Sequence, residues 1–309
     1  MIYAVGCDIG GTNCKVGLIN SNGGVADHLS FRVDHGAGIN RFLSTLCDSI
    51  DFLAKGRDLQ GIGVLLPGYL KENRTVPYIM VNIPMLEDVP LHGFLKERYG
   101  VTIALDIDRN GPCLAEYIFH YKGKFSRLMY VTIGTGVGVG LVVEGVICRI
   151  CNDSIGELGH VTLEPGGHLC VCGNTGCVET IVSKDGIRRI AERLGLASSI
   201  LKADETGLLS PGDIYEEALK GNEAALQVFK EFGRYLGAAL VTYANTFSPD
   251  IIVVGGGLAG ASEFFLKTAD EFLNKHWFER KAKRIPVKKT RFGAHAGIIG
   301  AASLVIGNG

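Results

Sequence analysis

Histidine and cysteine side chains gather in one short stretch of the chain, GHVTLEPGGHLCVCGNTGCVE. His160, Cys170, Cys172 and Cys177 make a Cys₃His set, which suits a closed, tetrahedral, structural zinc site. Glycines between the cysteines permit the sharp turns that such a knuckle needs. The alternatives are that His168 is the histidine ligand, or that the three cysteines are reduced thiols without a metal. The donor set and its spacing favour zinc.

Three glycine-rich turns each follow a strand-like run, at residues 8–12 (DIGGT), 134–140 (GTGVGVG) and 255–257 (GGG). Backbone N–H groups in such turns can bind phosphate oxygens, so three of them in one chain favour a nucleotide site. GTGVGVG is similar to the dinucleotide-binding fingerprint, but that motif opens a helix, whereas the LVVEGVI that follows is strand-like. We therefore expect a hairpin whose glycine turn faces a nucleotide.

Acidic side chains stand beside two strand-like runs. Asp8 could orient a hydrated Mg²⁺ near the terminal phosphates, because hard cations prefer carboxylate oxygens; the alternative is a turn-capping role. Asp108, in LDIDRN, is either a helix N-cap or a general base at the carboxyl end of a strand, where ligands collect in α/β sheets. Asp106, two residues earlier, is expected on the same face. Glu157 and His160, three residues apart, would share a face if their segment is helical.

Hydrophobic periodicity predicts the elements that position these residues. The first half has a hairpin over 3–19, a strand in HLSFRV, a helix over 39–55, a strand in GIGVLLPG, a helix over 90–99, a strand in VTIALD and a helix over 108–121. The second has a strand, glycine turn and strand in LMYVTIGTGVGVGLVVEGVI, helices over 179–195, 222–246 and 261–274, a strand in DIIVVGGG and a closing helix in AGIIGAASLVIG. This order predicts mixed sheets with helices on their faces, in two related halves.

Length and charge limit the class of protein. With 309 residues the chain can form one large or two medium-sized domains. Its 31 basic and 32 acidic side chains give a net charge of -1, which argues against nucleic-acid binding by bulk charge. No apolar run is long enough for a membrane span, and the first residues do not read as a signal peptide, so we expect a soluble cytoplasmic protein. The nine cysteines do not form a secreted disulfide framework, and most are expected to be reduced and buried.

Taken together, these motifs resemble the ROK family of repressors, open reading frames and kinases. DIGGTNCKVGLI is similar to the family's first phosphate motif, IGTGVGVGLVVEG to its second, NTFSPDIIVVGGGLA to its adenosine-side motif, and GELGH with CVCGNTGCVE to its signature pair. The similarity runs over nearly the whole chain. It implies an α/β, two-domain actin-like ATPase (ribonuclease H-like) fold with an interdomain cleft for a sugar. The implied domains are 1–112 with 297–309, and 113–296, which carries the zinc knuckle.

The resemblance also implies ATP- and Mg²⁺-dependent phosphorylation of a sugar hydroxyl, usually O6, with Asp108 as the catalytic base. The implied substrate-binding residues are Gly68, Asn82, Asp108, Glu157, His160 and Glu179. The implied nucleotide-binding residues are Asp8, Gly10, Gly11, Thr12, Asn13, Lys15, Gly134, Thr135, Gly136, Gly138, Gly255, Gly256 and Gly257. Zinc would hold the His160 ring so that its other nitrogen meets the sugar. Asn82 could otherwise be only a turn former.

One segment departs from the family pattern. Where sugar kinases of the family commonly read Glu-Asn-Asp-Ala-Asn, this chain reads DIDRN, so that Ile107 replaces an Asn that would hydrogen-bond a ring hydroxyl. A missing partner for a buried hydroxyl costs about 1–3 kcal/mol, enough to redirect specificity between epimers. The candidate sugars are therefore D-allose, glucose, fructose or an N-acetylmannosamine-like hexosamine.

Two other functions of the same family compete with a kinase. A sugar-sensing repressor carries a helix-turn-helix before the first phosphate motif, and we expect none here because Asp8 follows only seven residues. A catalytically inactive sugar-binding protein is the second alternative, motivated by the altered DIDRN segment. A small-molecule sugar is the expected partner, without nucleic acid or membrane, and family analogy implies a homodimer.

Overall fold

The computed structural model describes residues 2–122, 124–150, 153–196 and 210–306. The chain forms two compact units. Met1–Ser126, Gly140–Gly156 and Arg291–Gly309 make the first, and Arg127–Val139 with Glu157–Thr290 make the second. The domain bounds implied by the resemblance, 1–112 with 297–309 and 113–296, stay a prediction, because compact units are not necessarily the bodies that fold or move separately.

The first unit contains a five-stranded mixed sheet with the strand order β3-β2-β1-β4-β7. Its strands are β1 (Tyr3–Ile9), β2 (Asn13–Asn20), β3 (Val25–Arg32), β4 (Leu59–Leu66) and β7 (Thr102–Ile107). β1 pairs antiparallel with β2 and parallel with β4, and β4 pairs parallel with β7. The predicted hairpin and mixed sheet are therefore confirmed. A small separate hairpin is formed by β5 (Tyr69–Lys71) and β6 (Val76–Tyr78).

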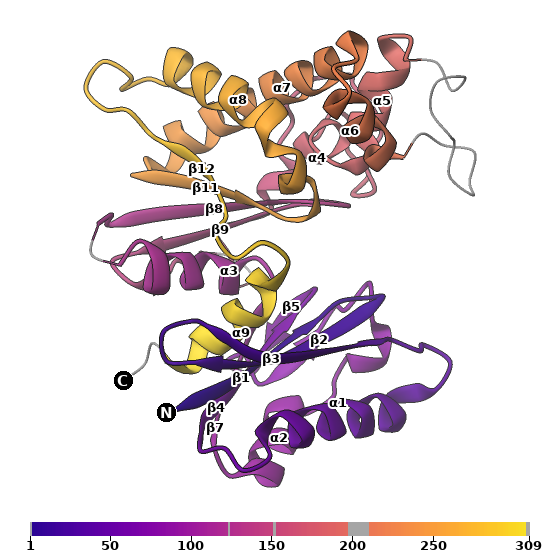
Figure 1. The fold of residues 1–309 in the computed structure, drawn as a ribbon, viewed down its shortest axis with the longest axis vertical. Coiled ribbons are helices and arrows are strands. Elements are labelled where there is room, and N and C mark those ends of the chain that lie inside the picture. The colour runs from indigo at the N-terminus through magenta and orange to yellow at the C-terminus, as the bar shows by residue number, and fades with distance from the viewer. Residues whose placement is uncertain (1, 123, 151–152, 197–209, 307–309) are drawn as a thin grey trace. The chain divides into compact units, whose positions relative to one another are not determined.

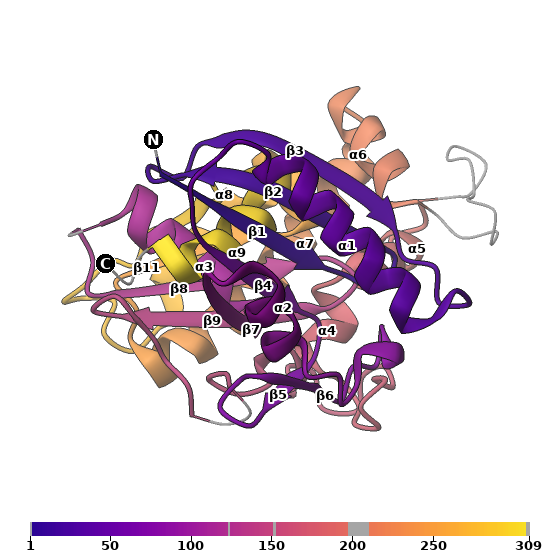
Figure 2. The same cartoon turned by 90° about the horizontal axis from the view of Figure 1, so that it is seen from below.

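Helices cover both faces of this sheet (Figures 1 and 2). α1 (Gly38–Ala54) and α2 (Leu91–Tyr99) lie on one face, and α9 (Ala296–Ile306) lies on the other and packs against α3 (Asn110–Ala115). α1 buries a stripe spaced by three and four residues, as its sequence predicts. α9 approaches the strands closely because they carry glycine beneath it: a methyl group on Gly6 or Gly63 would overlap the α9 backbone.

One helix of the first unit differs from the prediction over 108–121. The α-helix begins at Asn110 and ends at Ala115, and a short π-helix over Glu116–His120 follows it directly. A short 3₁₀ helix, Pro84–Leu86, lies between β6 and α2.

The second sheet has the order β10-β9-β8-β11-β12. Its strands are β8 (Arg127–Ile133), β9 (Val137–Val143), β10 (Val146–Ile147), β11 (Ile251–Gly255) and β12 (Val287–Lys289). The five strands of each sheet, counted in the order in which they occur along the chain, are arranged in the same way across the sheet. The third, second, first, fourth and fifth strands follow one another in both sheets. This shared order confirms the prediction of two related halves. Strand β9 also begins directly after the GTG turn, which confirms a hairpin and excludes the dinucleotide-binding fold there.

The helices of the second unit differ from the predicted pattern at two places, because the segment 179–195 is divided into two helices and the helix Pro211–Leu219 was not predicted. They are α4 (Val178–Ile181), α5 (Lys184–Arg193), α6 (Pro211–Leu219), α7 (Glu223–Phe247) and α8 (Ser262–His276), with α7 packed along α8 (Figure 1). Short 3₁₀ helices span Leu158–His160 and Gly257–Ala261 in this unit, and Gly293–His295 in the first unit. The expected single helix over 179–195 is broken because Ser183 has an extended backbone and caps α5, its hydroxyl accepting the N–H of Gly186.

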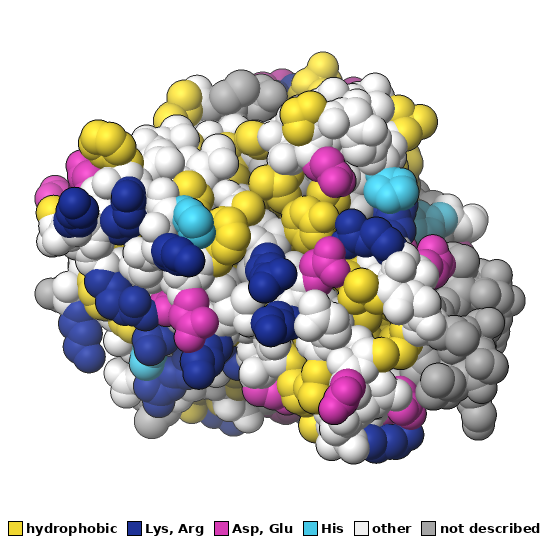
Figure 3. All heavy atoms as spheres, turned by 90° about the horizontal axis from the view of Figure 1, so that it is seen from above, with side chains coloured by type: hydrophobic (Ala, Val, Ile, Leu, Met, Phe, Trp, Pro, Cys, Tyr) yellow, Lys and Arg dark blue, Asp and Glu magenta, His cyan; other side chains and the backbone are white. Residues whose placement is uncertain are grey.

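In the described part of the chain, no helix is both long and apolar enough to cross a bilayer. Lys and Arg side chains lie among Asp and Glu side chains on the face in Figure 3, in keeping with the balanced charge. The eight cysteines that the structure describes form no disulfide, and most are buried as predicted; Cys151 lies outside the described residues.

Candidate functional site

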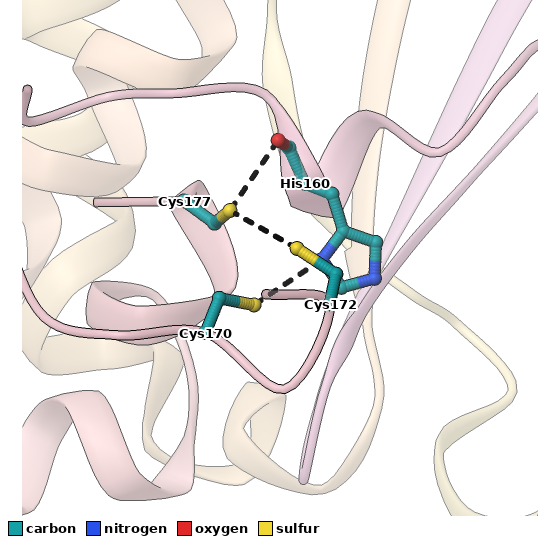
Figure 4. Close-up of side chains that lie close together, drawn as sticks. All are labelled: His160, Cys170, Cys172 and Cys177. Atoms are coloured by element: carbon teal, nitrogen blue, oxygen red, sulfur yellow. Dashed lines mark hydrogen bonds between the residues drawn. The ribbon is translucent and has the colours of Figure 1, made fainter. Parts of the chain in front are cut away.

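The predicted zinc ligands come together in the second unit. The ligand atoms of His160, Cys170, Cys172 and Cys177 all lie within 4.8 Å of one another (Figure 4). Cys172 Sγ is 3.7 Å from Cys177 Sγ, and Cys170 Sγ is 3.4 Å from His160 Nδ1. A tetrahedral zinc with bonds of about 2.3 Å to sulfur and about 2.0 Å to nitrogen separates its donors by roughly 3.5–3.8 Å. The four residues therefore fit zinc, and His168 is not part of this cluster.

Turn geometry explains how the sequence forms this knuckle. Gly173 and Gly176 have φ values of +90° and +71°, in the left-handed region that side chains disfavour. A methyl group on Gly176 would also overlap the carbonyl oxygen of Glu164. His160 ends the 3₁₀ helix that Glu157 precedes, and its N–H donates to the Glu157 carbonyl at 2.9 Å. Since Nδ1 faces the cysteines, the other ring nitrogen points away from them (Figure 4).

Glu179 connects this knuckle to the second glycine turn. It lies in α4, two residues after Cys177, and its Oε2 accepts the backbone N–H of Val137 at 2.9 Å. The same oxygen would overlap a Cβ at Gly136, so a side chain there would displace the Glu179 carboxylate. The Gly134 N–H closes the turn by donating to the Gly136 carbonyl at 2.9 Å. Thr135 is exposed in this turn, and Gly138 lies within β9.

The second and third glycine turns both lie beside the start of α5. The backbone N–H of Lys184 donates to the Gly134 carbonyl at 2.9 Å. A methyl group on Gly257 would lie 3.8 Å from Cε of the exposed Lys184 side chain. Gly255 and Gly256 lead from β11 into this turn, Gly256 with a φ of +84°. Sequence reasoning missed Lys184; the available signal was the helix start that Ser183 marks, directly before it.

The first glycine turn and Asn82 lie side by side within the first unit. The Gly10 N–H donates to the Asn13 carbonyl at 3.0 Å and closes the turn around Gly11 and Thr12. A methyl group on Gly11 would lie 2.7 Å from the Asn82 carbonyl oxygen. Asn82 is exposed in a turn, so it both forms a turn and borders the predicted phosphate loop.

Asp8 is a strand residue and not a turn cap. It lies in β1 opposite Lys15 of β2, and its carboxylate fills the space beside Gly297 in the first turn of α9. Burial raises the pKa of Asp8, and the charge of Lys15 partly offsets that rise. The Lys15 amine donates to the Ala294 carbonyl at 3.3 Å. A carboxylate beside a cation and a helix N-terminus can remain charged, as a Mg²⁺ ligand must.

Asp108 occupies the corner between β7 and α3. Because β7 ends at Ile107, strand alternation does not reach Asp108, which is exposed while Asp106 is 1% exposed. The expectation that the two carboxylates share one face is therefore wrong. α3 begins at Asn110, and Arg109 occupies its N-cap position without a side-chain cap. The Asp108 N–H donates to the Leu66 carbonyl at 3.0 Å.

Gly68 and Ile107 are the two other residues of interest near the turn between β7 and α3. Gly68 follows the end of β4 and lies against the carbonyl oxygen of Ile79, where no Cβ would fit. Ile107 is fully buried. The first unit thus places Asp108 and Gly68 just beyond the ends of two adjacent parallel strands, and the roles assigned to them stay predictions.

A comparison with protein families decides where this chain belongs. The sequence model of the ROK family matches residues 4–308. The chain is a member of the ROK family.

Known relatives of this ROK protein include enzymes and regulators. It is 32% identical over 314 residues to a glucokinase of Halalkalibacterium halodurans, with 98% of this chain and 94% of the glucokinase covered. It is 23% identical over 310 residues to a xylose repressor of Caldicellulosiruptor bescii, with 98% of this chain and 77% of the repressor covered.

A solved structure confirms the predicted fold. A ROK glucokinase of Streptomyces griseus, crystallised with glucose and AMPPNP, superposes with a TM-score of 0.81 at 25% identity, covering 98% of each chain. The α/β, actin-like ATPase fold is therefore established for this ROK protein.

Proposed function

We propose that this ROK protein is an ATP-dependent hexose kinase that phosphorylates a sugar hydroxyl, O6 by family analogy. The observation that carries the proposal is the position of Asp108, exposed just beyond β7 at the carboxyl end of parallel strands. Ligands collect at this edge of open α/β sheets, and a carboxylate there can accept a proton from a hydroxyl. Full-length relationship to glucokinases supports the same reaction.

In the proposed reaction Asp108 accepts the proton of the attacking sugar hydroxyl as the oxygen bonds to the γ-phosphorus of ATP. The glycine turns bind phosphate oxygens through their N–H groups, so catalysis is mostly positioning and electrostatic stabilisation. Asp8 would hold the hydrated Mg²⁺, which when bound neutralises charge on the phosphates. Lys15 and Lys184 add positive charge near the first turn and near the other two.

Zinc would have a structural role outside the chemical step. It would fix His160 through Nδ1, so that the other ring nitrogen is directed at a sugar hydroxyl. Glu157 precedes the same 3₁₀ helix, and Glu179 follows the last cysteine ligand. We propose that these three side chains bind the sugar, together with Asn82 and Gly68 in the first unit.

The sugar is identified by a screen. Purified protein is offered D-allose, D-glucose, D-fructose, D-mannose, N-acetylmannosamine and N-acetylglucosamine with Mg-ATP, and sugar-dependent ADP release is measured. Because Ile107 stands where sugar kinases of the family commonly carry an Asn, we expect a preference for a hexose other than glucose. Absence of ADP release with every sugar would refute the kinase proposal.

A sugar-sensing regulator is the second candidate, favoured by the similarity of 98% of this chain to 77% of a xylose repressor. It would bind a sugar without consuming ATP. Isothermal titration with the same sugars separates the two functions, because a regulator gives binding heat and no ADP release. Size-exclusion chromatography with light scattering tests the homodimer that family analogy suggests.

A further inference from the structure

A buried carboxylate lies two residues before the proposed base. Asp106 is 1% exposed, and both of its oxygens are engaged. Oδ1 accepts the Ile107 N–H at 2.8 Å and the Asn110 amide at 2.7 Å, and Oδ2 accepts a short hydrogen bond from Nη2 of Arg149. The pair thus joins the end of β7, the start of α3 and the segment after β10, all within the first unit.

Two hydrogen bonds join the segment that contains Arg149 to the turn between β7 and α3. Arg149 holds Asp106 and also donates from Nη1 to the Ile147 carbonyl at 3.2 Å. Four residues further on, the Asp153 carbonyl accepts the Asn110 amide at 2.8 Å. Because the Asn110 amide bonds both Asp106 and Asp153, it closes a continuous polar network around the turn that carries Asp108.

The charge of Asp106 depends on Arg149. Burial raises the pKa of Asp106, and the Arg149 charge is the largest influence that lowers it again. A buried ion pair that loses one partner leaves an uncompensated charge, which destabilises its surroundings far more than the loss of an exposed pair does. Without the guanidinium, Asp106 would either take up a proton and weaken its hydrogen bonds, or stay charged beside the base.

We propose that Arg149 is a positioning residue for the catalytic base, acting through Asp106 on the corner that holds Asp108. The inference rests on the proposed kinase function. Arg149 would keep the corner rigid and cancel the negative charge of Asp106, two residues before the base. Its loss should therefore lower the turnover number and shift the pH dependence of catalysis, while the binding of ATP and sugar, which uses other residues, changes little.

Two other arginines lie near this corner. Arg109 lies over the Tyr69 ring, with its guanidinium carbon 5.9 Å from the ring centre. Arg74 forms an ion pair of 3.7 Å with Asp153. Asp106 itself forms an ion pair with Arg149. We attribute a shift in the pH profile on removal of Arg149 to Asp106, because these two groups form the ion pair.

The test compares Arg149→Met, Arg149→Lys, Asp106→Asn and the double variant Arg149→Met/Asp106→Asn. Arg98→Met is the matched control, because Arg98 pairs with Asp51 in an exposed ion pair at 2.6 Å away from this corner. For Arg149→Met we expect at least a tenfold loss in kcat, KM values for ATP and sugar within about twofold, and an acid limb of the kcat profile moved to higher pH. Arg149→Lys should retain more turnover than Arg149→Met, because it keeps the positive charge.

The double variant gives the decisive comparison. It removes both charges together, so we expect it to recover turnover relative to Arg149→Met and to restore the pH profile. A kcat within twofold of the wild type and an unshifted profile in folded Arg149→Met would overturn the inference. If that variant fails to fold, an unchanged kcat and profile in Arg149→Lys, with a double variant no better than Asp106→Asn, would overturn it equally.

Failure of the inference can be told apart from failure of the proposed function. A wild-type protein without sugar-dependent ADP release, or an Asp108→Asn variant with full turnover, refutes the kinase proposal itself. If turnover is lost in Asp108→Asn but unchanged in Arg149→Met, only the positioning role of Arg149 is refuted.

Discussion

The Oε2 atom of Glu179 accepts the backbone N–H of Val137 at 2.9 Å, which joins the zinc knuckle to the second glycine turn. Glu179 lies two residues after Cys177, a predicted zinc ligand, and Val137 is the first residue of β9. One side chain therefore links the proposed metal site with the proposed phosphate site. A change in the Cys₃His cluster should therefore alter the binding of the nucleotide as well as the binding of the sugar.

Replacing Glu179 should separate these two effects. In Glu179→Ala the Val137 N–H loses its acceptor, and an unsatisfied buried donor costs about 1–3 kcal/mol. We expect KM for both ATP and sugar to rise. In Glu179→Gln an amide oxygen can still accept, so KM for ATP should stay near the wild-type value while KM for sugar rises. Steady-state kinetics with each substrate varied checks this, and equal ATP KM values in both variants would contradict the link.

Removal of a zinc ligand should loosen the knuckle. Cys172→Ser is expected to lose bound zinc, to lower the melting temperature and to raise KM for sugar by disordering His160 and Glu179. Zinc content by mass spectrometry, thermal unfolding and kinetics measure these effects. Cys148→Ser is the control, because Cys148 lies outside the Cys₃His cluster. Equal zinc content in both variants would rule out the assigned site.

Asp108→Asn tests the base directly. Loss of a general base typically costs about 10²- to 10⁴-fold in turnover, and we expect a loss of this size with sugar affinity preserved. Turnover comes from the coupled ADP assay and affinity from isothermal titration. Asp88→Asn, which alters an exposed carboxylate paired with Lys71, should leave both unchanged. Near-normal turnover of Asp108→Asn would remove Asp108 from the mechanism.

Lys184→Ala tests the charge beside the second and third glycine turns. Charge-assisted hydrogen bonds to phosphate are stronger than neutral ones, so we expect KM for ATP to rise about threefold to tenfold and KM for sugar to stay constant. The effect should shrink at high ionic strength, because the side chain is exposed. Lys267→Ala, on the exposed face of α8, serves as the control. An ATP KM equal to that of the control would refute this contact.

A pH dependence of stability is expected from His295. Its ring lies 4.8 Å from that of His28, and burial, followed by the charges of His28 and Lys15, lowers its pKa. The unfolded chain, with a histidine pKa of about 6.5, then binds the proton more tightly than the folded protein does. Stability should fall as the pH drops through this value towards the lower folded pKa. Urea unfolding between pH 7.5 and pH 5.5 should show a weaker decline in His295→Gln; an identical decline would contradict this origin.

Several elements were predictable because their signals are local. Residues close together in the sequence produce these signals. The periodicity of apolar side chains indicates the buried face of α1 and the buried strands β4 and β11, and the glycine turns indicate the hairpins. The break of α4 from α5 was missed because periodicity continues across it, and only the capping role of Ser183 reveals it.

By itself the sequence determined the donor set of the predicted zinc site, the three glycine turns, the repeat of strand, glycine turn and strand in the two halves, and a carboxylate at Asp108, because residue type and short-range spacing decide these features. Tertiary structure alone decided that Asp106 is buried against Arg149, 43 residues away, and that Glu179 reaches Val137, 42 residues away. The physical reason is that a hydrogen bond or ion pair acts over a few ångströms in space, whatever the separation along the chain, and only packing of the strands and helices brings such partners within that reach.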